Sequence, residues 1–482
     1  MSFKNTWNYG LRFVAHCGCW RLNQCTSSFR LNPIQRCDTA FRTAIAVDEC
    51  GMLGSGAEMS IEKVEVLVVG GGQAGLAISE HLDNCDLPHL VLERHRIAER
   101  WRTGRWDSLV ANGPAWHDKF PGLDFIDTNP DAFPPKEKVA DYFVEYAKKI
   151  AAPIRCGVEV KEVRRNVHRP GFHIQTSQGE IEATYVIAAT GPFQHPIFPA
   201  IVPEEEGIMQ IHSNAYRNPG QLPEGAVLVV GAGSSGTQIA DEILRAGKRV
   251  FLSVGPHSRY PRRYRRHDYC WWLGVLGLWD IEAPEPGAEH VTIAVSGAYG
   301  GYTVDFRHLA ARGMTLVGRA ERFRDGVLAF APGLAGNLAK GDADYTSVLD
   351  AADAYVARNG LDLPEEPDAR ALDPDPDCVG DPILELDLAK AGVTSIIWAT
   401  GYDVDYSWLK VDAFDEKGQP KHSRGVSAES GVYFLGLPWL SRRGSSFIWG
   451  VWHDARYLAH HISTHRGYMA YHSSTRRKIL GV

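Results

Sequence analysis

The chain contains no C-x-x-C pair, no Cys and His cluster with zinc-ligand spacing, and no G-x-S-x-G sequence. These absences argue against a dithiol redox centre, a structural zinc site and the nucleophile elbow of an α/β-hydrolase, respectively. We expect no metal site. Five of the nine cysteines lie in the first fifty residues, so no disulfide framework is indicated. The expected compartment is the reducing cytoplasm.

The sequence also lacks a long apolar run. The longest candidate, Cys270 to Trp279, is far shorter than the ~20 residues of a membrane-spanning helix, so no span is expected. A formal net charge of −7 argues against a general nucleic-acid or anionic-membrane partner. With 482 residues, 44% of them hydrophobic, the chain can form two or three domains with buried cores.

The first 58 residues differ from the rest, being rich in arginine, poor in acids at first, and without a regular pattern. We interpret residues 1–58 as a disordered or misannotated N-terminal extension, with translation starting at Met59. A transit peptide is the alternative interpretation.

The first strong motif is a glycine turn. An apolar strand at residues 64–69 leads into G-G-G-Q-A-G at residues 70–75 and then into an apolar helix. G-x-G-x-x-G between a strand and a helix is typical of a dinucleotide site, because backbone N–H groups at the helix start bind phosphate. The next strand ends in Glu93, about twenty residues on, where a carboxylate accepts from a ribose hydroxyl. We therefore assign FAD to Gly70, Gly72, Gln73, Ala74, Gly75 and Glu93.

The same pattern recurs at residues 226–236, where the turn reads G-A-G-S-S-G. Its predicted contacts are Gly231, Gly233, Ser234, Ser235 and Gly236. At the interval that separates Gly70 from Glu93, this second motif has Val254, so no acid is present to repel a 2′-phosphate.

A run of arginines follows this position, and it includes Arg259 and Arg262. Such a run favours NADPH over NADH. A solvated basic face and a nucleic-acid patch are the alternatives for the same residues.

Two similar segments, Ala189-Thr190-Gly191 and Ala399-Thr400-Gly401, each close a strand and are interpreted as crossovers between domains. The sequence thus predicts an α/β fold with two Rossmann-like dinucleotide-binding domains, the NADPH domain inserted in the FAD domain. The expected boundaries are residues 59–199 for the first part of the FAD domain, 200–385 for the NADPH domain with a substrate-pocket insertion, 386–465 for the second part of the FAD domain, and 466–482 for a C-terminal tail.

Near the end of the chain, Ser445 or Ser446 is expected to cap a helix that runs through Asp454 to His460. The N-terminus of that helix would stabilise negative charge on a reduced flavin.

With these motifs, the chain resembles the class B flavin-containing monooxygenases, a family that includes plant YUCCA-type enzymes. The similarity extends to bacterial flavoproteins catalogued under potassium transport. The resemblance implies FAD, NADPH and O₂ as reactants, a flavin C4a-hydroperoxide, and oxygenation of a small substrate containing nitrogen, sulfur or a carbonyl group. We expect no nucleic-acid partner, and a homodimer stays open.

The resemblance also implies further site residues. The segment from Val110 to Pro114 is similar to the family's Asn-Gly-Pro turn beside the flavin, which makes Asn112 the candidate catalytic residue, because a carboxamide both donates and accepts hydrogen bonds without titrating. An ordinary Asn-Gly turn is the alternative. Further cofactor contacts are expected at Arg94, Trp101, Val160, Gly191, Thr400, Gly401 and Gly436.

The family's identifying motif, F-x-G-x-x-x-H-x-x-x-(Y/F), is half kept. His212 and Tyr216 have the right spacing, but Glu206 and Ile208 stand where Phe and Gly are usual. Tyr216 replaces the Trp of Baeyer–Villiger relatives, which favours heteroatom or carbon hydroxylation. An NADPH-dependent flavin reductase or oxidase, and a regulatory flavoprotein without oxygenation activity, are the alternative functions.

The nucleotide preference can be measured directly. We expect a lower Michaelis constant for NADPH than for NADH, because the second turn lacks a ribose acid and is followed by arginines. Steady-state assays with both nucleotides check this, and a preference for NADH would contradict it.

Overall fold

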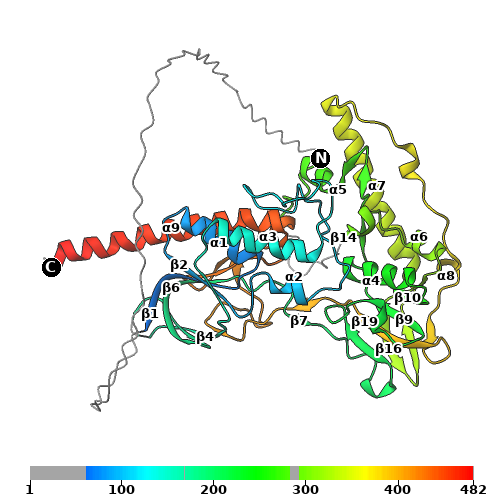
Figure 1. Ribbon diagram of the computed structural model, residues 1–482, viewed down its shortest axis with the longest axis horizontal. Helices are drawn as coiled ribbons and strands as arrows, with labels where there is room; N and C mark the ends of the chain where they lie inside the picture. Colours follow the sequence, from blue (N-terminus) through cyan, green and yellow to red (C-terminus); the bar gives the residue numbers. More distant parts are fainter. Residues whose placement is uncertain (1–60, 168, 283–292, 481–482) are drawn as a thin grey trace, which may run out of the picture. The chain divides into compact units, whose positions relative to one another are not determined.

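The computed structural model describes residues 61–167, 169–282 and 293–480. The interpretation of residues 1–58 lies outside this range. The described chain is a mixed α/β structure with two main sheets, and helices alternate with the strands along the chain (Figure 1). The predicted fold class is confirmed.

The first sheet has ten strands, and its central path runs in the order β21-β4-β5-β6-β1-β2-β3, with β24 added beside β6. In its centre, β1 pairs in parallel with both β2 and β6. The strands are β1 (Glu62–Val69), β2 (His89–Glu93), β3 (Ile154–Cys156), β4 (Val160–Arg165), β5 (Phe172–Thr176), β6 (Gly179–Ala188), β21 (Leu409–Lys410), β22 (His422–Ser423), β23 (Val426–Ser427) and β24 (Val432–Phe434).

Helices from both ends of the chain pack on this sheet. Helix α1 (Gln73–Asp83) contacts α3 (Lys136–Lys149) and α9 (Ile448–Leu480), and α9 runs beside α1 in Figure 1. Leu76 of α1 and Val451 and Leu458 of α9 are fully buried with the strands in one core. The burial of these apolar faces holds α9 against α1 and the strands.

The second sheet is parallel, with the order β15-β10-β9-β19-β8. Its strands are β8 (Met209–His212), β9 (Ala226–Val230), β10 (Val250–Ser253), β15 (Thr315–Val317) and β19 (Val393–Trp398). Side chains alternate between its faces, as a strand requires. Val227 and Val229 pack in the core shared with α4 (Ser234–Arg245), whereas Leu228 packs in the core shared with a small sheet of β16 (Ala320–Arg324), β17 (Val327–Phe330) and β18 (Glu385–Asp387).

The remaining helices and the short strand pairs complete the fold. The helices are α2 (Glu99–Thr103), α5 (Tyr269–Val275), α6 (Phe306–Ala311), α7 (Leu334–Asn359) and α8 (Asp377–Gly380). Short strand pairs are β7 (His195–Pro196) with β20 (Tyr402–Asp403), β11 (Ser258–Arg259) with β14 (Ile293–Ala294), and β12 (Arg263–Tyr264) with β13 (His267–Asp268).

Two expected boundaries are wrong. The second FAD segment was placed from residue 386, but β19 (Val393–Trp398) pairs with β8 and β9 and so belongs to the second sheet. The chain returns to the first sheet only after Ala399. The expected tail from residue 466 is instead the continuation of α9, which ends at Leu480. None of the helices described, α9 included, is long and apolar enough to cross a membrane.

Candidate active site

The first glycine turn joins β1 to α1 and is shaped by close backbone contacts. Gly70 has φ +115°, and a Cβ there would lie 2.5 Å from the carbonyl oxygen of Ala189, at the end of β6. A Cβ at Gly75 would collide with the carbonyl oxygen of Gly70. Both positions therefore need glycine for turn geometry and helix packing.

Gly72 has a different environment, because a Cβ there would meet no protein atom within 4 Å. It is also the N-cap of α1, and no side chain caps the helix. The first backbone N–H groups of α1 are thus left for an outside acceptor, next to open space. This cradle fits the pyrophosphate of a dinucleotide.

Glu93 lies at the carboxyl end of β2, beside the turn. Its Oε2 accepts from the backbone N–H of Gly71 at 2.8 Å, and its Oε1 accepts from that of His95 at 2.8 Å. A Cβ at Gly71 would lie 2.8 Å from the Cβ of Glu93. Gly71 thus holds the predicted ribose acid in place, a role that the motif alone does not reveal.

The C-terminal part of the chain reaches the same turn. The side-chain amide of Gln73 donates to the carbonyl oxygen of Ser446 at 2.8 Å, and a Cβ at Gly436 would lie 2.9 Å from the Cβ of Ala74. The start of α9 therefore lies beside the first nucleotide turn, as its expected action on a flavin requires.

The predicted cap of α9 is wrong in detail. Ser445 Oγ accepts from the backbone N–H groups of Ser441 and Arg442, so it closes the short turn at residues 443–446. The helix itself begins later, at Ile448.

The second turn repeats the geometry of the first. Gly231 has φ +109°, a Cβ there would lie 2.5 Å from the carbonyl oxygen of Ala399, and a Cβ at Gly236 would collide with the carbonyl oxygen of Gly231. Gly233 is the N-cap of α4, again without a side-chain cap. Ser234 Oγ donates to the carbonyl oxygen of Ile293 at 2.9 Å, and Ser235 is half-buried.

The two Ala-Thr-Gly segments occupy equivalent positions. The N–H of Ala189 donates to Val69 at 2.9 Å and that of Ala399 donates to Val230 at 2.8 Å, so each alanine is tied to the strand that enters its turn. The glycines that follow, Gly191 and Gly401, have φ +74° and +87° and redirect the chain. Thr400 Oγ1 donates to Ile197 at 2.6 Å, which ties one crossing to the other.

The arginines after β10 are engaged with carboxylates. Arg259 is buried between Asp305 and Asp342, at 2.6 Å from each. Arg262 forms a 2.7 Å ion pair with Asp268. These pairs account for the burial of both side chains, whose contact with a 2′-phosphate stays a prediction.

Asn112 lies between the two nucleotide domains and contacts the second. Its Oδ1 accepts from Gln238 Nε2 of α4 at 2.9 Å, and its backbone oxygen accepts from Arg262 at 2.6 Å. Arg262 lies between the rings of Phe133 and Tyr269, at 4.3 and 4.6 Å from their centroids. Gln238 was not among the predicted residues. Its position in the helix that follows the second glycine turn is the one feature of the sequence that could have pointed to it.

The remaining predicted contacts are Trp101, Arg94 and Val160. Trp101 is half-buried with Arg105 near its ring, and Arg94 is exposed. Val160 is half-buried at the start of β4, whereas the N–H of Val158 donates to the backbone oxygen of Glu93 at 3.0 Å. Val158, in the loop between β3 and β4, thus contacts the main chain of the ribose acid.

Several aromatic side chains of the segment between residues 200 and 385 belong to packed regions. Trp272 and Trp279 are buried, and Tyr302 donates to Asp241 at 2.7 Å. His117 stacks on Trp279, with its Nδ1 2.7 Å from a carboxylate oxygen of Asp118. Within the described ranges, no group of His, Cys, Asp and Glu is arranged to hold a metal ion.

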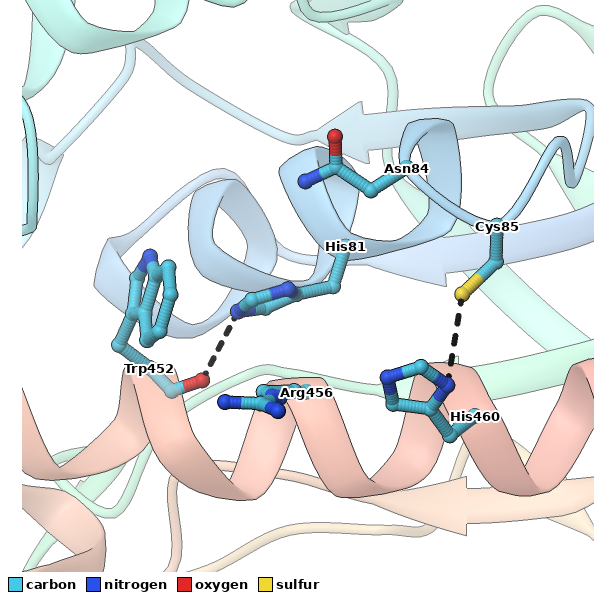
Figure 2. A pocket seen from close by; sticks show the side chains of 6 residues that line it. All are labelled: His81, Asn84, Cys85, Trp452, Arg456 and His460. Carbon is cyan, nitrogen blue, oxygen red and sulfur yellow. Dashed lines mark hydrogen bonds between the residues drawn. The ribbon is translucent and has the colours of Figure 1, made fainter. Parts of the chain in front are cut away.

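Figure 2 shows a pocket of about 230 Å³ between α1 and α9. It lies at the end of α1 that is remote from the glycine turn. Burial lowers the pKa of His81 to about 4 and raises the pKa of the Cys85 thiol, so neither group is activated at neutral pH. We therefore do not assign the active site to this pocket.

Comparison with known proteins places this geometry in a family. Residues 67–269 match the model of the pyridine nucleotide-disulphide oxidoreductase family. An uncharacterized CzcO-like oxidoreductase of Geobacillus kaustophilus is 33% identical over 83% of this chain and 99% of its own length. The chain belongs to the family of CzcO-like oxidoreductases.

Other relatives support the same grouping. The YUCCA1 protein of Arabidopsis thaliana, described as a probable indole-3-pyruvate monooxygenase, is 29% identical over 39% of this chain and 46% of its own length. A flavin-containing monooxygenase of Stenotrophomonas maltophilia has the same fold, with a TM-score of 0.58 and 20% identity over 84% of this chain and 99% of its own. The resemblance to class B flavin monooxygenases is confirmed. This CzcO-like protein is an oxidoreductase, and its matches support flavin and nicotinamide cofactors.

Substitutions at Gly72 and Gly75 should distinguish a loss of flavin binding from a loss of folding. Gly72→Ala should lower flavin affinity by at least about tenfold, or ~1.4 kcal/mol, because the new Cβ projects into the cradle without meeting protein. Flavin content and a binding titration measure this change.

The thermal midpoint of the Gly72→Ala apoprotein should be unchanged, whereas Gly75→Ala should disturb folding itself. Gly274→Ala, also in open space but in α5, serves as the matched control. Normal flavin affinity in Gly72→Ala would show that the cradle lies elsewhere.

Proposed function

We propose that this oxidoreductase is an FAD- and NADPH-dependent monooxygenase that transfers one atom of O₂ to a small organic substrate. The observation that supports this most is the convergence at Asn112, where the segment after the first turn hydrogen-bonds to the helix that follows the second. A reaction that passes electrons between two dinucleotides requires their two sites to meet in this way.

The residues divide into two cofactor sites. FAD would be held by the first turn, with Glu93 at its ribose and the start of α9 near its ring system. NADPH would be held by Gly231, Gly233 and the uncapped start of α4. When bound and reduced by NADPH, FAD supplies the oxygen-activating chemistry, and the protein contributes binding, orientation and exclusion of water.

In this proposal Asn112 orients the reacting groups by hydrogen bonds and takes no part in proton transfer. A carboxamide keeps the same donors and acceptors across the physiological pH range, so its contribution does not change with pH. The substrate class remains one with an oxidisable nitrogen or sulfur, or a carbonyl group.

Product analysis with labelled oxygen tests the function. Incubation of the holoenzyme with NADPH, ¹⁸O₂ and a library of amines, sulfides and carbonyl compounds should give a product that is heavier by one labelled oxygen. NADPH consumption with hydrogen peroxide as the sole product would identify a reductase or oxidase instead. Negligible turnover together with co-purification of a partner would favour a regulatory flavoprotein.

Asn112→Ala tests the central residue. We expect about five- to tenfold more hydrogen peroxide per NADPH consumed, since one lost hydrogen bond corresponds to ~1–1.4 kcal/mol. Peroxide release and labelled product are measured in the same reaction. If both remain at the wild-type level, Asn112 has no part in the mechanism.

A further inference from the structure

Gln238 lies on α4, one turn past the start of the helix, and its side chain is buried. Its Nε2 is 2.9 Å from the carbonyl oxygen of Val295 and 2.9 Å from Oδ1 of Asn112. One amide nitrogen thus bridges a backbone carbonyl and the side chain that we place at the centre of the reaction.

This arrangement determines the orientation of two side-chain amides in series. The carbonyl oxygen of Val295 can only accept, so Gln238 must direct its NH₂ group toward it. Both hydrogens of that group are then used, one toward Val295 and one toward Asn112. Asn112 must consequently present its oxygen to Gln238, which directs its Nδ2 away from α4.

The opposite orientation is disfavoured by buried polar atoms. If Gln238 were rotated by half a turn, its Oε1 would face the Val295 oxygen without a proton between them. Two buried acceptors would then be unpaired, at about 1–3 kcal/mol for each. The orientation therefore follows from a backbone carbonyl, which cannot rotate.

The rest of Asn112 is held independently. Arg262 donates to its backbone oxygen at 2.6 Å and is itself fixed by two hydrogen bonds to Asp268. With the main chain fixed, the rotation of the carboxamide is the remaining degree of freedom, and Gln238 controls it.

We infer that Gln238 is a positioning residue that makes Asn112 a hydrogen-bond donor toward the bound cofactors. This inference rests on the proposed role of Asn112. Gln238 itself does not touch the reacting atoms. The Nδ2 of Asn112 supplies the N–H group for an oxygen at the flavin–nicotinamide contact, while Oδ1 is occupied by Gln238.

The hydrogen bond is tested first without activity, in the apoprotein. Gln238→Leu and Asn112→Ala should each lower the thermal midpoint by about 2–4 °C, and the double variant should lose less than the sum of the two. Strictly additive losses would show that the two side chains are not coupled and would overturn the inference.

The donor role is tested by Asn112→Asp. A carboxylate still accepts from Gln238, so the apoprotein midpoint should stay near that of the wild type, but the N–H donor is gone. Peroxide released per NADPH should therefore rise about as much as in Asn112→Ala. Wild-type coupling in Asn112→Asp would overturn the inference.

Gln238→Leu completes the set. It should raise peroxide release severalfold without changing flavin content or the Michaelis constant for NADPH, and in the Asn112→Ala background it should add nothing. Gln210→Leu is the matched control, since Gln210 also uses a side-chain amide to bind a backbone oxygen and a side chain in the second domain, at Val202 and Trp398. An equal effect of Gln210→Leu on peroxide release would indicate a merely structural role.

These results separate the inference from the proposed function. If the wild type incorporates labelled oxygen and Asn112→Ala is uncoupled, normal coupling in Gln238→Leu rejects the inference alone. If the wild type incorporates none, the proposed function fails, and the apoprotein coupling still decides whether Gln238 orients Asn112.

Discussion

Each nucleotide turn depends on one close backbone approach, in which its first glycine lies against the carbonyl oxygen of the alanine that directly follows a neighbouring parallel strand, β6 in the first sheet and β19 in the second. At both Gly70 and Gly231 a Cβ would lie 2.5 Å from that oxygen. Both glycines also have a positive φ, +115° and +109°, a conformation that residues with a Cβ rarely adopt, so only glycine avoids both the backbone strain and the collision. Glu93 and the segment before α9 are held at the first turn by hydrogen bonds to Gly71 and Gln73.

The sequence was informative wherever a contact is local. The strand, turn and helix at residues 64–82 are consecutive, and their spacing carries the phosphate chemistry. The partners of Asn112 could not be predicted in this way, because Gln238 and Arg262 lie more than a hundred residues further along the chain. No pattern around Asn112 reveals which helix it meets.

Errors in the prediction have the same physical origin. The strand Val393–Trp398 fell in the expected second FAD segment, residues 386–465, yet strand pairing places it beside β9. Serine is a residue type that often caps helices, but the side chain of Ser445 closes the short turn before the helix. In the first case hydrogen bonds to a distant strand decide the domain of the segment, and in the second hydrogen bonds to nearby backbone groups decide the role of the serine.

The arginine run after β10 illustrates how charge in a sequence differs from charge on a surface. Arg259 binds Asp305 and Asp342, and Arg262 binds Asp268, so these two charges are compensated within the fold. Removing one partner would leave a buried charge unpaired, which is more costly than losing the pair as a whole. Arginines in a basic stretch can therefore be buried in ion pairs inside a domain and need not form a basic surface.

The two segments that connect the domains, one after each Ala-Thr-Gly, lie side by side. Strand β7 on the outward crossing pairs with β20 on the return, through Tyr402 with Pro196 and Asp403 with His195. The intervening chain leaves and re-enters at one place, so it behaves as a cassette on a single two-stranded stem. A change in the length of that inserted chain, including the stretch that carries α7, would leave every strand of the first sheet in place.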